Sequence, residues 1–205
     1  GHKDFAEDTY RTLTAVETAL MMIDAAKGVE TQTIKLMEVC RLRDTPIVTF
    51  INKFDRDTLD PFELLDNIEK VLSIQAIPLT WPIGDGPDFK GVIDLLSQKI
   101  RLFSNALNPF ELTILDGSNL DSPEIIDTIG KKLIDKLKLD LEMIKGVIPP
   151  LDLNEFNSGI QTPVFFGSAL FNFGVKEVLD FINANAPGPK PRTAKLPPYD
   201  SSAES

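Results

Sequence analysis

The sequence lacks the features that are typical of secreted and membrane proteins. It contains a single cysteine, Cys40, so no disulfide can form within the chain, and this fits a reducing compartment. No apolar run approaches the ~20 residues that a transmembrane helix needs. The polar, charged stretch from Gly1 to Leu13 does not resemble a signal peptide. We therefore expect a cytoplasmic protein that has no membrane partner.

Basic residues are also in the minority. The chain has 21 Lys and Arg against 31 Asp and Glu, a formal net charge of -10 and a pI near 4.6. Such a chain gains little from counterion release at phosphates, so we expect no direct sequence-specific binding of nucleic acid by these residues. The composition, with 42% hydrophobic and 25% charged residues, is that of an ordinary globular protein. The 205 residues suffice for one sizeable domain, with or without an insertion.

The order of apolar runs and amphipathic stretches predicts an α/β fold. We expect a short helix over 4–17, strands at 19–25, 45–55 and 76–81, and helices at 29–43 and 60–72. This alternation is typical of βαβ units and a parallel sheet. The continuous apolar run 19–25 indicates a strand that is buried on both faces. Ligands bind at the carboxyl ends of such strands, where Asp24 and Asn52 lie.

The alternation breaks between about residues 85 and 161. Short strands within 89–117, a helix that begins at Ser122, a repeat of leucines that ends near Gly146, and a short helix over 151–159 predict an inserted α+β subdomain. The main domain then consists of residues 1–84 and 162–188. The proline-rich residues 189–205 are typical of a linker toward a following domain.

The tetrad Asn52-Lys53-Phe54-Asp55 has the residue types that recognise guanine. A carboxylate at Asp55 can accept hydrogen bonds from both N1–H and N2–H of the base, whereas adenine presents no such pair of donors. Asn52 can tie the loop together and reach the acceptor edge, and the stem of Lys53 can lie along the base. Four residues recur by chance, and the bare tetrad also fits a solvated turn between a strand and a helix. Its position after a buried strand and before a capped helix favours the base-binding interpretation.

A second candidate loop follows the apolar run 162–166. Ser168, Ala169 and Leu170 form a stretch of mostly small residues that can approach a base and point a backbone N–H at guanine O6. Taken alone, this stretch also fits an ordinary junction between a strand and a loop. His2 at the terminus is either functional or, with Gly1, the remnant of an expression tag. No Gly-x-x-x-x-Gly-Lys-Ser/Thr sequence, which would hold phosphates, occurs anywhere in the 205 residues.

Four blocks resemble the ribosome-associated translational GTPases, and within them the peptide chain release factor 3 family most closely. They are "GHKDFAEDTYRTLTAVE", "MMIDAAKGVETQTIKLMEVCRLRDTPIVTFINKFDRD", "WPIGDGPDFKGVIDL" and "TPVFFGSALFNFGV". The resemblance implies the α/β class, with a three-layer P-loop-type GTPase sheet that lacks its phosphate-loop strand and carries the inserted α+β subdomain. It further implies that the chain is the second half of a nucleotide-binding domain, cut just before Gly1.

The resemblance also implies a role for each matching residue. Asn52, Lys53 and Asp55, together with Ser168, Ala169 and Leu170, would bind guanine. Gly1 would sense the γ-phosphate, and His2 would be the catalytic residue that positions the attacking water. The intact protein would use GTP and GDP with Mg²⁺ and act on the ribosome to recycle stop-codon-reading release factors.

The chain alone is expected to have no metal ligands, to bind nucleotide weakly and to be inactive. An exposed strand edge would favour self-association. Two alternatives stay open. One is another translational GTPase, such as elongation factor G or a ribosome-protection protein. The other is a GTPase-like module that does not hydrolyse nucleotide.

Overall fold

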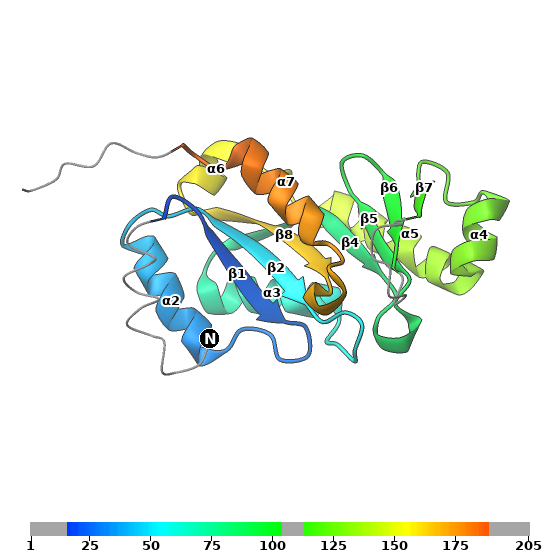
Figure 1. Cartoon of the computed structure of the whole chain (residues 1–205), viewed down its shortest axis with the longest axis horizontal. Helices are drawn as coiled ribbons and strands as arrows, with labels where there is room; N and C mark the ends of the chain where they lie inside the picture. Colours follow the sequence, from blue (N-terminus) through cyan, green and yellow to red (C-terminus); the bar gives the residue numbers. More distant parts are fainter. Residues whose placement is uncertain (1–15, 104–112, 189–205) are drawn as a thin grey trace, which may run out of the picture.

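The computed structural model describes residues 16–103 and 113–188 (Figure 1). The helix expected over 4–17 and the linker 189–205 lie almost entirely outside these residues, as do Gly1 and His2. Two β-sheets and the helices around them make up the described part. One sheet is parallel and holds the candidate site, and the other is antiparallel and formed by the middle of the chain.

The parallel sheet has the strand order β1-β2-β8-β3. Its strands are β1 (Ala19–Asp24), β2 (Ile47–Asn52), β8 (Gln161–Gly167) and β3 (Gln75–Pro78). In the pairing register, Asp24 lies beside Asn52, and Asn52 lies beside Gly167. The carboxyl ends of β1, β2 and β8 are therefore level, and the loops that follow them start at one edge of the sheet.

Helices cover both faces of this sheet and produce three layers (Figure 1). The helices α2 (Thr31–Arg41) and α3 (Pro61–Leu72) pack on one face with the larger hydrophobic core. The helices α6 (Leu153–Asn157) and α7 (Val175–Asn185) pack on the other face in a smaller core. The predicted α/β class with three layers is thus confirmed.

Local sequence signals explain where α3 begins and ends. The Asp60 carboxylate accepts a hydrogen bond from Phe62 N at 2.9 Å, and Pro61 occupies the first helical position, as predicted. At the other end, the guanidinium of Arg41 on α2 donates to the carbonyls of Leu72 and Ser73. These carbonyls have no partner within the helix, so the arginine satisfies groups that the helix end leaves open.

The prediction that β1 is buried on both faces was wrong. Leu20 and Met22 are each 46% exposed, whereas Ile23 on the opposite face is buried. The strand lies at the end of the described sheet, and its Ile23 face packs against the α2 and α3 side. A continuous apolar run therefore does not distinguish a strand covered on both faces from one covered, among the described residues, on a single face.

The antiparallel sheet has the order β4-β5-β6-β7. Its strands are β4 (Thr80–Ile83), β5 (Gly91–Asp94), β6 (Lys99–Leu102) and β7 (Ile114–Asp116). The apolar run that we expected to form one strand at 76–81 is divided, because β3 and β4 belong to different sheets with Leu79 between them. A short 3₁₀ helix, η2 (Gly86–Asp88), precedes β5.

Two helices follow the antiparallel sheet. Ser122 caps α4 (Pro123–Ile129) by accepting a hydrogen bond from Ile125 N at 3.4 Å. Gly130, at φ 98°, separates α4 from α5 (Lys131–Val147). The helix α5 continues through Gly146, where we had expected it to end. No helix in residues 16–103 and 113–188 is long and apolar enough to cross a membrane.

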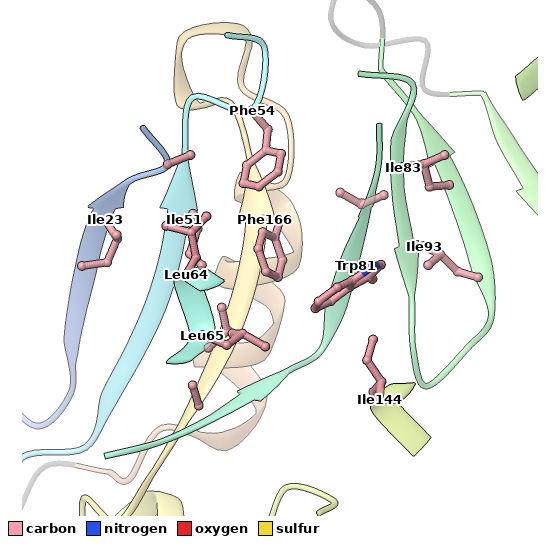
Figure 2. Packing of buried hydrophobic residues seen from close by; sticks show 14 of the residues in the cluster. Ile23, Ile51, Phe54, Leu64, Leu65, Trp81, Ile83, Ile93, Ile144 and Phe166 are labelled. Atoms are coloured by element: carbon pink, nitrogen blue, oxygen red, sulfur yellow. The ribbon is translucent and has the colours of Figure 1, made fainter. Parts of the chain in front are cut away.

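One hydrophobic core joins the two sheets (Figure 2). Trp81 on β4 and Phe166 on β8 meet where the sheets approach each other, with ring centroids 5.5 Å apart. The backbone N–H of Phe166 donates to Thr80 Oγ1 at 3.0 Å, and Trp81 Nε1 donates to Asp140 Oδ2 on α5 at 3.0 Å. The antiparallel sheet is therefore fastened to the strand that leads into the second candidate loop.

Candidate functional site

The two candidate loops lie side by side at the carboxyl edge of the parallel sheet. The first follows β2 and contains the tetrad from Asn52 to Asp55. The second follows β8 and runs from Ser168 to Phe173, with the 3₁₀ helix η3 (Ala169–Phe171) inside it. The level ends of β2 and β8 bring the loops together although they are far apart in the sequence.

Asn52 joins the two loops. Its Oδ1 accepts hydrogen bonds from Lys53 N at 2.8 Å and from Ala169 N at 2.8 Å. An amide oxygen has two lone pairs, so a single side chain can hold both N–H groups. The backbone adds a further link, since Phe54 N donates to Gly167 O at 3.1 Å. Both acceptor positions of Asn52 Oδ1 are therefore occupied by hydrogen bonds that link the two loops.

Lys53 adopts a conformation that is unusual for a residue with a side chain. Its φ is 77°, in the left-handed region. Its ammonium group lies 2.5 Å from Asp24 Oδ2 at the end of β1. Burial acts to raise the pKa of Asp24, but the Lys53 ammonium and the Ala26 N–H outweigh it and hold that pKa below its usual value. The carboxylate therefore stays ionised at neutral pH and fixes the end of the lysine chain.

Asp55 has a carboxylate oxygen without a partner. Its side chain is only 11% exposed, and its Oδ1 has no hydrogen-bond partner among the described residues. Its Oδ2 lies 3.8 Å from Arg56 Nε, which is a loose ion pair. A nearly buried acceptor that is left open costs free energy unless a ligand or solvent supplies a donor. Asp55, the residue that we predicted to read the base, thus has an unpaired acceptor that is shielded from solvent.

The second loop is tight and closely packed. Ser168 N donates to Phe173 O at 3.0 Å, and Phe173 N donates back to Ser168 O at 2.9 Å. A Cβ on Gly167 would lie 2.3 Å from Phe173 O, so only glycine fits there. The Ser168 hydroxyl is buried and has no partner within the described residues, whereas Leu170 is 72% exposed. The backbone N–H of Ala169 donates to Asn52 Oδ1.

Sequence reasoning assigned no role to Asn67, which shapes the loop after β1. Its Oδ1 accepts a hydrogen bond from Val29 N at 2.8 Å. A Cβ on Gly28, at φ 68°, would lie 2.6 Å from the same oxygen. The only signal available was a polar residue between the apolar Leu65 and Ile68 of α3. Nothing in the spacing of the sequence links this helix to the loop that begins at Asp24.

The side chains at this edge are better suited to hydrogen bonding with a base than to holding a metal ion. In the described ranges 16–103 and 113–188, no group of three or more His, Cys, Asp or Glu side chains could hold a metal ion. The residues that converge at the carboxyl edge are one amide, one ammonium and two carboxylates, from Asn52, Lys53, Asp24 and Asp55. That set fits a planar ligand with both donors and acceptors on its edge.

The α/β fold is consistent with a GTPase domain of the elongation factor Tu type, and sequence comparison identifies the family. A model of the family described as the elongation factor Tu GTP-binding domain matches residues 1–188. The chain belongs to this family, and it is therefore a domain of the translational GTPases. Members of the family bind GTP and GDP with Mg²⁺.

A search of solved structures gives the same fold. A crystal structure of a protein from Thermus thermophilus superposes with a TM-score of 0.66 and 20% sequence identity. The match covers 92% of this chain and 29% of the other. The chain therefore spans less than a third of the length of that protein, and at this identity the likeness concerns the fold alone.

Proposed function

We propose that this chain recognises the guanine base of GTP and GDP through the two loops at the carboxyl edge of the parallel sheet. The observation that carries the proposal is the buried, unpaired Oδ1 of Asp55 next to two loops that Asn52 Oδ1 joins through a 2.8 Å hydrogen bond to Ala169 N. In this arrangement Asp55 accepts the N1–H and N2–H groups of guanine. Adenine offers no donor pair there, so the carboxylate would be desolvated without compensation.

The other site residues have distinct roles in the proposal. Lys53, held at its end by Asp24, lays its aliphatic stem against one face of the base. The loop from Ser168 to Leu170 approaches the O6 edge. Asn52 fixes the distance between the loops and thereby the width of the slot. The small side chain of Ala169 allows the loop to approach the base closely.

The phosphates need groups that residues 1–205 do not supply in recognisable form. In phosphate-loop GTPases, backbone N–H groups and a lysine hold the β- and γ-phosphates, and a Ser/Thr and an Asp hold Mg²⁺. No such phosphate-loop sequence occurs in these 205 residues. We propose that this chain alone binds nucleotide weakly and does not hydrolyse it. In the protein to which it belongs, Gly1 would sense the γ-phosphate and His2 would position the water.

The finer role that we propose is in translation termination. The gene product that carries this chain acts on the ribosome, in the cytoplasm, and promotes recycling of stop-codon-reading release factors. This proposal is supported by the four sequence blocks, of which "EDTYRTLTAVE" and "FFGSALFNFGV" are the most specific. It is tested with ribosomes stalled at a stop codon after peptide release. GTP-dependent acceleration of release-factor departure is expected, whereas GTP-dependent movement of tRNA and mRNA would identify an elongation factor G type instead.

Base recognition itself is tested on the 205-residue chain by NMR titration with guanosine and with adenosine. Free nucleosides isolate the base from the phosphates. The expected result is that guanosine shifts the amide resonances of Lys53, Asp55 and Ser168, while adenosine at the same concentration leaves them in place. Equal shifts with both nucleosides would contradict guanine recognition by these loops.

A further inference from the structure

The aromatic ring inside the tetrad points away from the proposed base slot and toward the antiparallel sheet. Phe54 is fully buried, and its ring centroid lies 5.2 Å from that of Phe166 and 5.9 Å from that of Phe89 (Figure 2 shows Phe54 and Phe166). Phe89 lies just before β5. A residue of the antiparallel sheet region therefore packs directly beneath the first base loop.

The same aromatic cluster reaches the second base loop. Phe103, which follows β6, contacts the rings of Phe171 and Phe173 in edge-to-face geometry, each at a centroid distance of 5.4 Å. Phe89 contacts Phe173 at 5.7 Å and Phe103 at 5.1 Å. Phe171 and Phe173 belong to the loop that begins at Ser168. Two phenylalanines next to the antiparallel sheet thus touch both base loops and each other.

Polar contacts fasten the sheet at the same place. Gly86 N in η2 donates to Phe54 O at 3.0 Å. On the other side, Arg101 Nε on β6 lies 2.6 Å from Glu177 Oε1 in the first turn of α7, where the glutamate side chain is 6% exposed. The contact is a close ion pair rather than a well-directed hydrogen bond. Because α7 follows the second loop directly, this pair anchors the loop at its far end.

From these contacts we infer that Phe89 and Phe103 are positioning residues for base recognition. They hold the two loops at the separation that lets Asn52 Oδ1 reach Ala169 N, and so set the width of the guanine slot. The inference rests on the proposed function. Neither ring needs to touch the base, since each acts through Phe54 or through Phe171 and Phe173. Edge-to-face pairs prefer particular ring orientations, so the cluster fixes orientation as well as distance.

The experiment compares four variants of the 205-residue chain. Phe89→Leu and Phe103→Leu remove the two rings that we propose as supports. Phe171→Leu removes the ring in the second loop that Phe103 contacts, and because Phe171 is half-buried, the fold should tolerate this change. Phe156→Leu is the control, because Phe156 is a buried ring that contacts Phe181 at 5.5 Å in the separate core on the opposite side of the parallel sheet. Thermal unfolding reports how much stability each variant loses.

Two readouts separate positioning from stability. The first is hydrogen exchange of the Ala169 amide without ligand, and the second is the guanosine dissociation constant from NMR titration. At equal loss of stability, the three cluster variants are expected to speed Ala169 exchange and weaken guanosine binding about two- to tenfold more than Phe156→Leu does.

Parallel changes in all four variants would overturn the inference while leaving guanine recognition intact. The inference would also fail if the cluster variants left both readouts at wild-type values. If the wild-type chain did not prefer guanosine over adenosine, the proposed function would fail. The Ala169 exchange rates would then still decide whether the cluster sets the loop separation.

Discussion

Asn52 Oδ1 and Ala169 N are 2.8 Å apart, although their residues are separated by 117 positions in the sequence. The segment between them contains the whole antiparallel sheet and the helices α4 to α6. The contact therefore depends on β2 and β8, which lie side by side in parallel and end level at one edge of the sheet. It also makes the two loops a single unit, since a movement of one pulls on the other.

Replacing Asn52 with alanine should separate the loops. The change removes the acceptor of two backbone N–H groups, and unsatisfied donors of this kind typically cost ~1–3 kcal/mol. We expect guanosine binding by Asn52→Ala to weaken about tenfold or more. The amide of Ala169 should also lose its protection from exchange. Asn119→Ala, in a turn between β7 and α4, is the control, and wild-type guanosine affinity in Asn52→Ala would contradict this role of Asn52.

A second prediction concerns Asp140 and the pH dependence of stability. Burial raises the pKa of this carboxyl, although the hydrogen bond from Trp81 acts in the opposite direction. Since the folded-state pKa lies above the unfolded one, the folded state favours the protonated form. The contribution of protonated Asp140 to the stability of the fold is complete below the unfolded-state pKa of about 3.9. It is lost as the pH rises through the folded-state pKa.

Asp140→Asn retains an oxygen acceptor for Trp81 Nε1 and removes the titration. We therefore expect this variant to melt at a higher temperature than wild type at pH 7, with the advantage disappearing toward about pH 4. Asp135→Asn on the same helix α5 is the control, because Asp135 is exposed in an ion pair with Lys131. Thermal melts followed by circular dichroism give the comparison. A constant difference across this pH range would show that desolvation of the carboxylate is not the cause.

The edge of the parallel sheet leads to a third prediction. In the part of the chain that the structure describes, β1 pairs with β2 alone and exposes Leu20 and Met22. Such an edge favours association with other copies. We expect the purified chain to self-associate, and Met22→Lys to reduce this in analytical ultracentrifugation. Leu179→Lys on α7, at a residue that is also exposed, should change little. A monomeric wild-type chain at high concentration would refute the prediction.

The fourth prediction is that GTP binds this chain no more tightly than guanosine does. Two or three charge-assisted hydrogen bonds to the base contribute ~1.5–3 kcal/mol each. The cost of immobilising a ligand is ~4–15 kcal/mol. The balance gives a dissociation constant of about 1 mM or weaker. Calorimetric titration with GTP, GDP and guanosine should show three similarly weak isotherms, and submicromolar GTP binding would reveal phosphate contacts that the sequence does not indicate.

Much of the fold could be predicted because its signals are local. Asp60 and Pro61 predict the start of α3, Ser122 predicts the start of α4, and the apolar run of β2 predicts a buried strand. The same local signals failed for residues 76–81, which we expected to form one strand but which are divided between the two sheets. Between Ala76 and Trp81 the only local mark of the change from a parallel to an antiparallel sheet is Pro78, just before Leu79, and the buried apolar run on both sides of it indicates one strand.

The site shows the same division between local and distant information. The residue types of the tetrad indicate guanine chemistry, so the sequence names Asn52 and Asp55 as candidates for binding the base. The partner of Lys53 could not, because Asp24 lies on a neighbouring strand and meets the lysine only through the register of β1 and β2. The support from Phe89 and Phe103 was equally hidden, since a buried phenylalanine looks the same whether it fills a core or positions a loop.

The most direct test replaces one acceptor oxygen of Asp55 with a hydrogen-bond donor. In Asp55→Asn the side chain presents an amide donor in place of one carboxylate oxygen, which suits the 2-oxo group of xanthine and not the 2-amino group of guanine. Binding of guanosine and xanthosine is measured by NMR titration of wild type, Asp55→Asn and the control Asp57→Asn, which removes the same charge from an exposed position. We predict that Asp55→Asn alone reverses the preference, from guanosine to xanthosine. An unchanged preference for guanosine in Asp55→Asn would contradict the assignment of Asp55 as the residue that reads the base.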